Sequence, residues 1–131
     1  MRVTISKRFD FDAAHFLPNV HDGHKCRRLH GHTYVVEVIC SGIPDPTTQW
    51  LCDYADIAAA WEPVWKEIDH RCLNDIPGLG NPTTEVLAPW ILGKLIADSR
   101  VPVSAVRVYE SSSTWCQAER ADVYPGCMEV E

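Results

Sequence analysis

The first residues of the chain alternate between apolar and polar side chains. Positions of one parity are mostly apolar, and those of the other parity are mostly polar or charged. A period of two predicts a half-buried β-strand over residues 2–16. The alternation is disturbed at residues 12–14, where we expect a β-bulge. The apolar face of this strand is formed by Val3, Ile5, Phe9, Phe11, Ala13 and His15.

Three further segments show the same alternation. Residues 30–41 place His30, His32 and several apolar side chains on one face. Near the other end of the chain, residues 103–110 and 114–123 alternate in the same way, with a serine-rich turn between them. We therefore predict four strands in total.

Two segments between the second and third strands have helical spacing. Apolar residues recur every three or four positions over residues 53–68, and Asp53 is suited to cap the start of this helix. Pro63 lies inside the pattern, so we expect a kink there. A second helix is predicted from about residue 82 or 84 to residue 98, with Pro89 inside it.

The predicted order of elements is ββααββ. Two hairpins separated by a pair of helices indicate an α+β fold, in which an antiparallel four-stranded sheet carries both helices on one face. The length of 131 residues corresponds to a single domain spanning residues 1–131. A sheet this small leaves one face and its edges uncovered, and oligomerisation would cover them.

Composition narrows the possible partners and location. The net charge is −6, with 18 acidic against 12 basic residues, which argues against nucleic acid as a partner. Charges interrupt the N-terminal segment, and no apolar stretch is long enough to cross a membrane, so we expect a cytoplasmic protein. Six cysteines are present without a C-x-x-C pair, and in that compartment they should stay reduced.

The clearest local motif is His30-Gly31-His32. Residues i and i+2 of a strand project from the same face, and His15 lies at the end of the preceding strand on its apolar parity. Three neutral imidazoles that converge there would suit a tetrahedral Zn²⁺ with one open position. The alternative is that they are ordinary core histidines. His21 and His24 compete as ligands, although we expect both to be loop residues.

Cys26 lies in a polar loop beside Lys25, Arg27 and Arg28. As a fourth ligand it would close the metal site and make the zinc structural. Left free beside the metal and these cations, its thiolate could transfer protons. The third possibility is an inert loop thiol.

Three other places carry candidate chemistry. Asp69-His70 ends the first predicted helix, where such a pair is either a helix terminus or a catalytic pair. Glu110 ends an apolar strand face, so it is either exposed or binds a guanidine-like ring edge through two parallel N–H bonds. Thr83 and Thr84 either cap the second helix or bind a ligand.

In combination and in this order, these motifs resemble the 6-pyruvoyl-tetrahydropterin synthase family. The resemblance extends from Phe9 to Glu110. Three residues separate Cys26 from His30, a spacing that is similar to the 6-carboxy-5,6,7,8-tetrahydropterin synthases of queuosine biosynthesis. The motifs that carry the resemblance are His15, Cys26-Arg-Arg-Leu-His30-Gly-His32, Asp69-His70, Asn81-Pro-Thr-Thr-Glu85 and Glu110.

The resemblance implies a tunnelling fold, in which subunits join their sheets into a barrel as trimers that stack into a hexamer. It also implies active sites at the subunit interfaces. The implied substrate is 7,8-dihydroneopterin triphosphate, and the products are 6-carboxytetrahydropterin, acetaldehyde and triphosphate.

The resemblance further implies a role for each motif. Cys26 would be a general base rather than a fourth ligand, and Asp69 and His70 would complete a proton relay. Glu110 would anchor the amino-pyrimidine edge of the pterin, with help from Thr83 and Thr84. Zn²⁺ would be held by His15, His30 and His32, and Lys25, Arg27 and Arg28 are candidates to meet the triphosphate.

Three alternatives remain at this stage. The nearest is the sister activity of a 6-pyruvoyl-tetrahydropterin synthase, which eliminates triphosphate and retains the side chain. Another is a non-catalytic scaffold domain, whose zinc site is closed by Cys26. RNA binding through residues 25–28 is a third, but it would need a basic surface that the composition does not supply.

Overall fold

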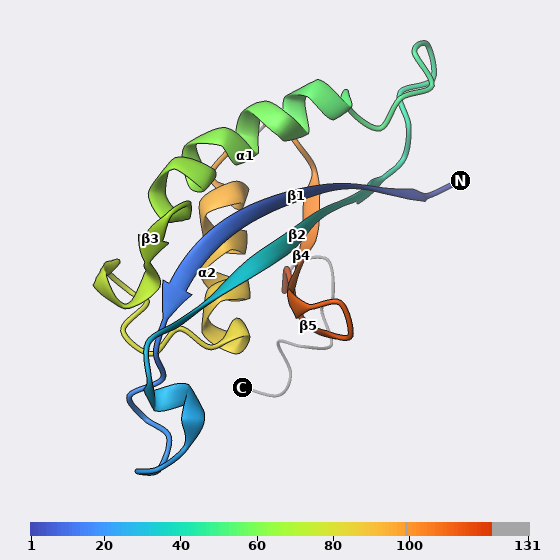
Figure 1. Cartoon of the computed structure of the whole chain (residues 1–131). Coiled ribbons are helices and arrows are strands. Elements are labelled where there is room, and N and C mark those ends of the chain that lie inside the picture. The colour runs from blue at the N-terminus through green and yellow to red at the C-terminus, as the bar shows by residue number, and fades with distance from the viewer. Residues whose placement is uncertain (99, 122–131) are drawn as a thin grey trace.

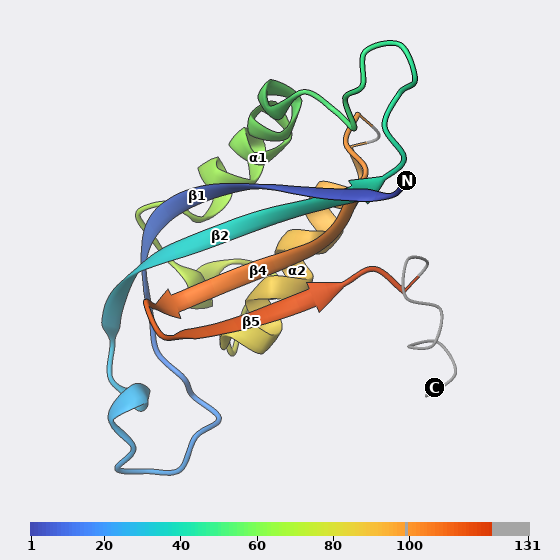
Figure 2. The same cartoon turned by 90° about the vertical axis from the view of Figure 1, so that its right-hand side faces the viewer.

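One sheet forms the centre of the molecule, and two helices lie against the same face of it (Figures 1 and 2). The structure is a computed structural model and describes residues 1–98 and 100–121. The strand order is β3-β1-β2-β4-β5. The strands are β1 Val3–His15, β2 His30–Gly42, β3 Arg71–Cys72, β4 Val103–Ser111 and β5 Thr114–Glu119, and the helices are α1 Tyr54–Ile68 and α2 Thr84–Ile96.

This architecture confirms the α+β fold predicted from the sequence. The four predicted strands are present, and their pairings with one another are antiparallel. The two-residue strand β3 was not predicted, and it pairs in parallel with Ala13 and Ala14 of β1. Two residues are too few to show an alternation of apolar and polar side chains, so the sequence pattern could not predict this strand. It forms because the chain returns to the edge of the sheet after α1.

The expected bulge in β1 is wrong. Pairing between β1 and β2 runs without a shift from Val3 opposite Gly42 to His15 opposite His30. Ala14 lies on the more exposed side of the strand, so its small apolar side chain disturbed the pattern without disturbing the backbone. The register shifts fall elsewhere, at Ile39/Cys40 between β2 and β4 and near the turn between β4 and β5.

The first helix begins at the expected cap, Asp53, and of the two roles open for Thr83 the structure shows the helix cap. The Asp53 side chain accepts a hydrogen bond from the Ala55 N–H at 2.9 Å, and Thr83 accepts one from the Val86 N–H at 3.3 Å. Each cap satisfies a backbone donor that has no partner inside the helix. Pro63 and Pro89 both lie within helices.

Aromatic side chains join α1 to the sheet. The ring of Phe9 stacks on Trp61 with centroids 5.3 Å apart, and Phe11 stacks on Tyr34 at 4.9 Å. Burying one such side chain contributes about 1.5–3 kcal/mol. Trp65, which the helical pattern assigns to the buried stripe, is instead 38% exposed.

The far end of the chain differs slightly from the prediction. Strand β5 ends at Glu119, and residues 122–123 of the strand predicted to reach 123 lie outside the described residues. Cys40 is fully buried, as its apolar neighbours indicate, whereas Cys72 and Cys116 are only partly buried. Among the helices of the described residues, none is long and apolar enough to cross a membrane.

No helix covers the other face of the sheet among the described residues (Figure 2), and this face carries polar side chains. On it, the guanidinium groups of Arg8 and Arg107 donate to the Tyr109 hydroxyl at 3.2 and 3.3 Å. Ser6 donates to Glu37 at 2.7 Å. One edge of the sheet is β5, and along the other edge β3 pairs with only two residues of β1. Within residues 1–98 and 100–121, most of the β1 edge therefore has no strand partner.

Candidate active site

The β1–β2 register brings three histidines together on the helix-facing side of the sheet. His15 pairs directly with His30, and His32 pairs with Ala13, two residues before His15. Alternation along each strand then directs all three imidazoles to one side. Their ring centroids are 4.6–5.0 Å apart. The structure thus assembles the three histidines that the sequence pattern predicts as metal ligands.

Backbone contacts determine the tautomer of His15. Its Nδ1 lies 2.9 Å from the carbonyl oxygen of Pro82. A carbonyl oxygen can only accept, so Nδ1 carries the proton and Nε2 of the neutral ring keeps its lone pair. The Tyr34 hydroxyl lies 3.2 Å from the same Nδ1, and burial raises the pKa of this phenol.

His30 is oriented in the same way. Its Nδ1 donates to the carbonyl oxygen of Arg28 at 2.7 Å, which leaves a lone pair on Nε2. The two Nε2 atoms of His15 and His30 face each other at 3.0 Å. Two lone pairs at this distance repel unless a cation or a proton lies between them. Donation from Nδ1 to a carbonyl is also the supporting contact that metal-binding histidines usually make.

The third imidazole also directs an unsatisfied nitrogen into the cluster. Nε2 of His32 is buried and has no hydrogen-bond partner among the described residues. Glu110 Oε1 lies 3.0 Å from it but outside hydrogen-bonding direction. A buried nitrogen without a partner is costly, and coordination of a metal ion would remove that cost.

The electrostatics favour the neutral forms of His15 and His32. Burial lowers the pKa of His15, and the neighbouring His30 and His32 lower it further, against an opposing contact with Pro82. Burial also lowers the pKa of His32, although the Glu110 carboxylate acts in the opposite direction. Neutral imidazole is the form that binds metals.

One ligand atom from each of four residues lies within 4.8 Å of the others: His15, His30, His32 and Glu110. Nitrogen donors with one carboxylate are a typical set for a catalytic transition metal. The residues present therefore fit a metal ion. Glu110 was predicted as a pterin anchor, and its closeness to the imidazoles is new information from the structure.

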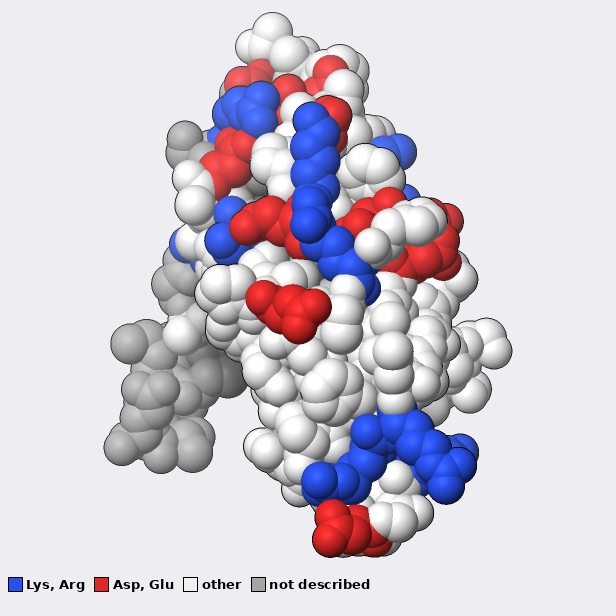
Figure 3. Space-filling view, turned by 60° about the vertical axis from the view of Figure 1, so that its left-hand side comes forward, with Lys and Arg blue, Asp and Glu red and all other residues white. Residues whose placement is uncertain are grey.

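Cys26 opens onto the same site. A cavity of about 470 Å³ is lined by Lys25, Cys26, Arg28, Leu29, His30, His32 and Glu110. Cys26 belongs to the 3-10 turn Lys25–Arg27 in the loop between β1 and β2. Figure 3 shows Lys and Arg side chains gathered at the lower end of the molecule, where Figure 1 places this loop. A thiol, a carboxylate, imidazoles and cations thus surround one cavity.

The three predicted phosphate-binding cations differ in their surroundings. Lys25 and Arg28 line the cavity. The Arg27 guanidinium instead donates to the carbonyl oxygens of Pro18 and Val20 at 2.9 and 2.8 Å. Arg27 therefore holds the loop in shape.

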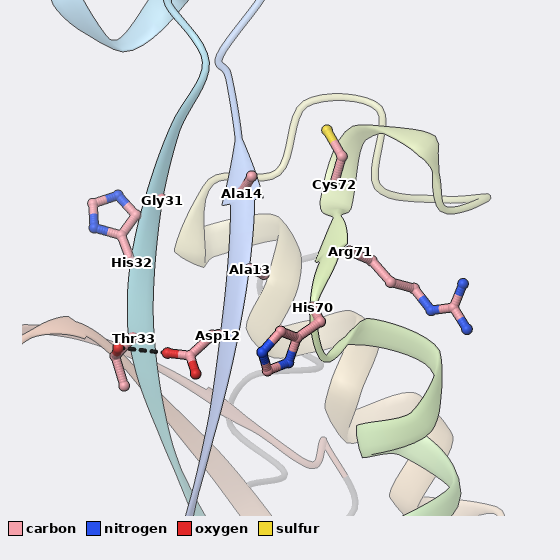
Figure 4. Close-up of a pocket in the computed structure, with 9 residues that line it drawn as sticks. All are labelled: Asp12, Ala13, Ala14, Gly31, His32, Thr33, His70, Arg71 and Cys72. Carbon is pink, nitrogen blue, oxygen red and sulfur yellow. Dashed lines mark hydrogen bonds between the residues drawn. The ribbon is translucent and has the colours of Figure 1, made fainter.

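Asp69 and His70 form a second group, at the free edge of β1. Asp69 accepts from the Asp12 N–H at 3.0 Å and from His70 Nδ1 at 2.7 Å. Figure 4 shows the Asp12 carboxylate directed at Thr33 of β2 and the His70 ring on the other side of β1, while His32 projects from the side of β2 that is turned away from β1. Asp12 is on the exposed parity of β1 and His15 on the buried one. Asp69 and His70 therefore do not belong to the histidine cluster, although His70 and His32 both line one pocket that extends across β1 and β2.

The backbone of His70 is unusual. Its φ of 57° is in the left-handed region, which costs energy for any residue other than glycine. The His70 N–H donates to the Asp12 carbonyl at 2.6 Å, and this contact helps to hold the conformation. The hydrogen bond to Asp69 raises the pKa of His70. Desolvation opposes ionisation of Asp69, but the bonds from His70 and Asp12 outweigh it and lower the pKa of this carboxyl.

The loop before α2 supports the histidine cluster. Thr83 serves as the helix cap, and the Thr84 hydroxyl donates to Glu85 at 3.0 Å, so their roles in substrate binding stay predictions. Sequence reasoning missed Asn74, which both accepts from the Phe16 N–H at 3.0 Å and donates to the Phe16 carbonyl at 2.7 Å. This bridge ties the chain after His15 to the segment that leads to α2. Its only sequence signal is an asparagine in a loop.

Fold and site together define an α+β protein with a histidine-rich site that could hold a catalytic metal beside a cysteine. The family model described as 6-pyruvoyl tetrahydropterin synthase matches residues 4–121. The chain belongs to this family, and it is a lyase.

Individual relatives agree with this assignment. The chain is 40% identical over 116 residues to the 6-carboxy-5,6,7,8-tetrahydropterin synthase of Synechocystis, covering 84% of this chain and 88% of that one. It is 37% identical over 91 residues to a dihydroneopterin monophosphate aldolase of Pyrococcus furiosus, covering 70% and 73%. Among solved structures, the 6-pyruvoyl tetrahydropterin synthase of Caenorhabditis elegans superposes with a TM-score of 0.84 at 27% identity, covering 92% and 96%.

The histidine cluster predicts metal binding that depends on its own members. Replacing His32 with Ala removes one donor, so metal affinity should fall by more than the roughly 10–100-fold that loss of a supporting hydrogen bond costs. Bound metal per chain, measured by elemental analysis after dialysis against a competing chelator, checks this. His21→Ala is the matched control, because His21 lies in the loop outside the cluster. Equal metal content in both variants would contradict the assignment.

The Asp69 contact predicts the titration of His70. Asp69→Asn should lower the His70 pKa toward its ordinary 6.5, because the charged acceptor is lost. Asp12→Asn should lower it less, since Asp12 acts only through its charge. NMR titration of the imidazole measures both shifts, and an unchanged pKa in Asp69→Asn would refute the coupling.

The same shift determines the sign of a stability effect. Folding raises the pKa of His70, so the protonated His70 stabilises the folded state. This stabilisation is complete below about pH 6.5 and is lost as the pH rises through the pKa of His70 in the folded protein.

Proposed function

We propose that this chain is a zinc-dependent lyase that converts 7,8-dihydroneopterin triphosphate to 6-carboxy-5,6,7,8-tetrahydropterin, acetaldehyde and triphosphate, as a step of queuosine (7-deazaguanine) biosynthesis. The observation that carries the proposal is the cavity that Cys26 lines together with His30, His32 and Glu110. The name of the Synechocystis relative supports the choice of product.

Zinc would be held by the Nε2 atoms of His15, His30 and His32. The lowered pKa values of His15 and His32 and the Nδ1 contacts of His15 and His30 support this ligand set. Three protein ligands leave a coordination position open, as in catalytic zinc sites. When bound, the ion would act as a Lewis acid that polarises the oxygens of the substrate side chain.

In the cavity, Cys26 would transfer a proton and Glu110 would bind the pterin. Cys26 would take a proton from the substrate side chain as its general base, since a thiolate is a competent base near neutral pH. Glu110 is about one-third exposed and lines the cavity, so its carboxylate can accept two parallel N–H bonds from the amino-pyrimidine edge of the pterin. Thr83 and Thr84 would assist there.

Lys25 and Arg28 would meet the phosphates of the substrate. Both line the cavity that contains Cys26, and cations at its rim would favour a polyanionic ligand. Arg27 is the weakest candidate of the three, because backbone carbonyls already occupy its guanidinium.

Asp69 and His70 would reach the cavity from another copy of the chain. Two observations support this: the pair lies at the sheet edge and outside the cluster, and most of that edge of β1 has no strand partner among the described residues. A trimer, or a hexamer of two trimers, that joins sheets edge to edge would also cover the open edges. In such a site His70, held by Asp69, would return protons to the substrate. The cytoplasmic location stays a prediction.

Incubation of the zinc-loaded protein with 7,8-dihydroneopterin triphosphate tests the proposed reaction. We expect acetaldehyde and 6-carboxytetrahydropterin in equal amounts, measured by a coupled dehydrogenase assay and by chromatography. Cys26→Ala should lower kcat by about 10²–10⁴-fold, the range for a general base, with metal content unchanged.

Other outcomes would assign other functions. Release of triphosphate with a pyruvoyl product and no acetaldehyde would indicate the sister activity. Turnover of the monophosphate alone would indicate the activity for which the Pyrococcus relative is named. Loss of zinc and folding in Cys26→Ala, with no turnover in the unmodified chain, would leave a zinc-stabilised scaffold.

A composite site predicts complementation between inactive variants. Cys26→Ala and His70→Ala should each be inactive alone, whereas oligomers assembled from both chains contain some sites with both groups intact. After homo-oligomers are removed, the mixed oligomers should show about a quarter (hexamer) to a third (trimer) of the activity of the unmodified chain. Co-expression with two affinity tags, followed by purification on both, provides the mixed oligomer. No recovery in that sample would refute a site shared between chains.

A further inference from the structure

The loop between β1 and β2 is held in a defined shape although it is largely exposed. The Leu17 N–H donates to the Cys26 carbonyl at 2.7 Å, which ties the turn to the end of β1. Arg27 reaches back to the carbonyls of Pro18 and Val20. The backbone of Cys26 also makes a hydrogen bond to a histidine, His24.

His24 caps the 3-10 turn that contains Cys26. Its Nδ1 accepts a hydrogen bond from the Cys26 N–H at 3.0 Å, and its carbonyl accepts from the Arg27 N–H at 3.1 Å. The His24 backbone, with φ −68° and ψ 133°, is extended as a capping residue requires. Because Nδ1 accepts, the proton of the neutral ring lies on Nε2. His24 lies outside the histidine cluster.

Histidine is not one of the residues that usually cap a helix start. The imidazole can do so because Nδ1 is bonded to Cγ, in the place that Oδ1 occupies in asparagine. The ring of His21 packs edge-on against that of His24, with centroids 5.3 Å apart, and restricts its rotation. The acceptor therefore stays directed at the Cys26 amide.

We propose that His24 is a positioning residue for Cys26: its Nδ1 lone pair fixes the turn so that the thiol faces the cavity with His30, His32 and Glu110. The inference rests on the proposed function in taking Cys26 as the reacting thiol. It assigns to His24 a role that differs from metal binding, and it does not involve contact with substrate.

Three substitutions separate the acceptor from the rest of the ring. His24→Asn keeps an acceptor at the Nδ1 position, His24→Gln moves it to the Nε2 position, and His24→Ala removes it. In the zinc-loaded protein, the Gln and Ala variants should lower kcat about fivefold, the factor that corresponds to one capping bond, with KM and metal content unchanged. The Asn variant should retain kcat.

Hydrogen–deuterium exchange of the Cys26 amide provides a readout that does not need turnover. Exchange should be about fivefold faster in His24→Ala and His24→Gln than in the unmodified chain and in His24→Asn. Equal exchange in all four proteins would overturn the capping role. Faster exchange with an unchanged kcat would overturn the positioning role. If the unmodified chain does not turn over the pterin, the proposed function fails, while the exchange data still decide whether His24 caps the turn.

Discussion

The candidate site depends on the register between β1 and β2. Because His15 is opposite His30 and Ala13 is opposite His32, the three imidazoles meet at one level of the sheet and on one face. A shift by a single residue would turn His15 to the other face, since side chains alternate along a strand. The same shift would expose Phe11, which packs against Tyr34 in the core. Hydrophobic packing and the geometry of the site therefore favour the same register.

Two backbone carbonyls orient the imidazoles that the register brings together. The carbonyls of Pro82 and Arg28 come from segments far apart in the sequence, and each fixes the proton of one imidazole on Nδ1. Burial then opposes protonation of His15 and His32. The result is a preorganised set of lone pairs, and preorganised donors bind a cation without the cost of rearrangement. Asn74 contributes indirectly, because it ties the chain after His15 to the loop that supplies Pro82.

The position of the Asp69–His70 pair outside the histidine cluster relates the active site to the association of chains. Among the described residues, β5 forms one edge of the sheet and β3 covers only two residues of the other, so backbone groups remain that a second chain could pair with. A site divided between chains would make catalysis depend on oligomer formation. The loop that carries Cys26 is then the part of the site that each chain must shape by itself, which explains why so many contacts hold an exposed loop.

Local periodicity let the sequence alone determine the four long strands, the two helices with the cap at Asp53, and the face of its own strand on which each of His15, His30 and His32 lies. These features depend on neighbours within a few residues, so the pattern contains them. Tertiary structure alone decided the parallel pairing of β3, the placement of Glu110 beside His32, and the different roles of Arg27 and Arg28. It also decided that His24 caps the Cys26 turn. Each of these features depends on how the chain folds back on itself and on which carbonyl or side chain then lies nearby. The pattern of polar and apolar residues along the chain does not contain that information.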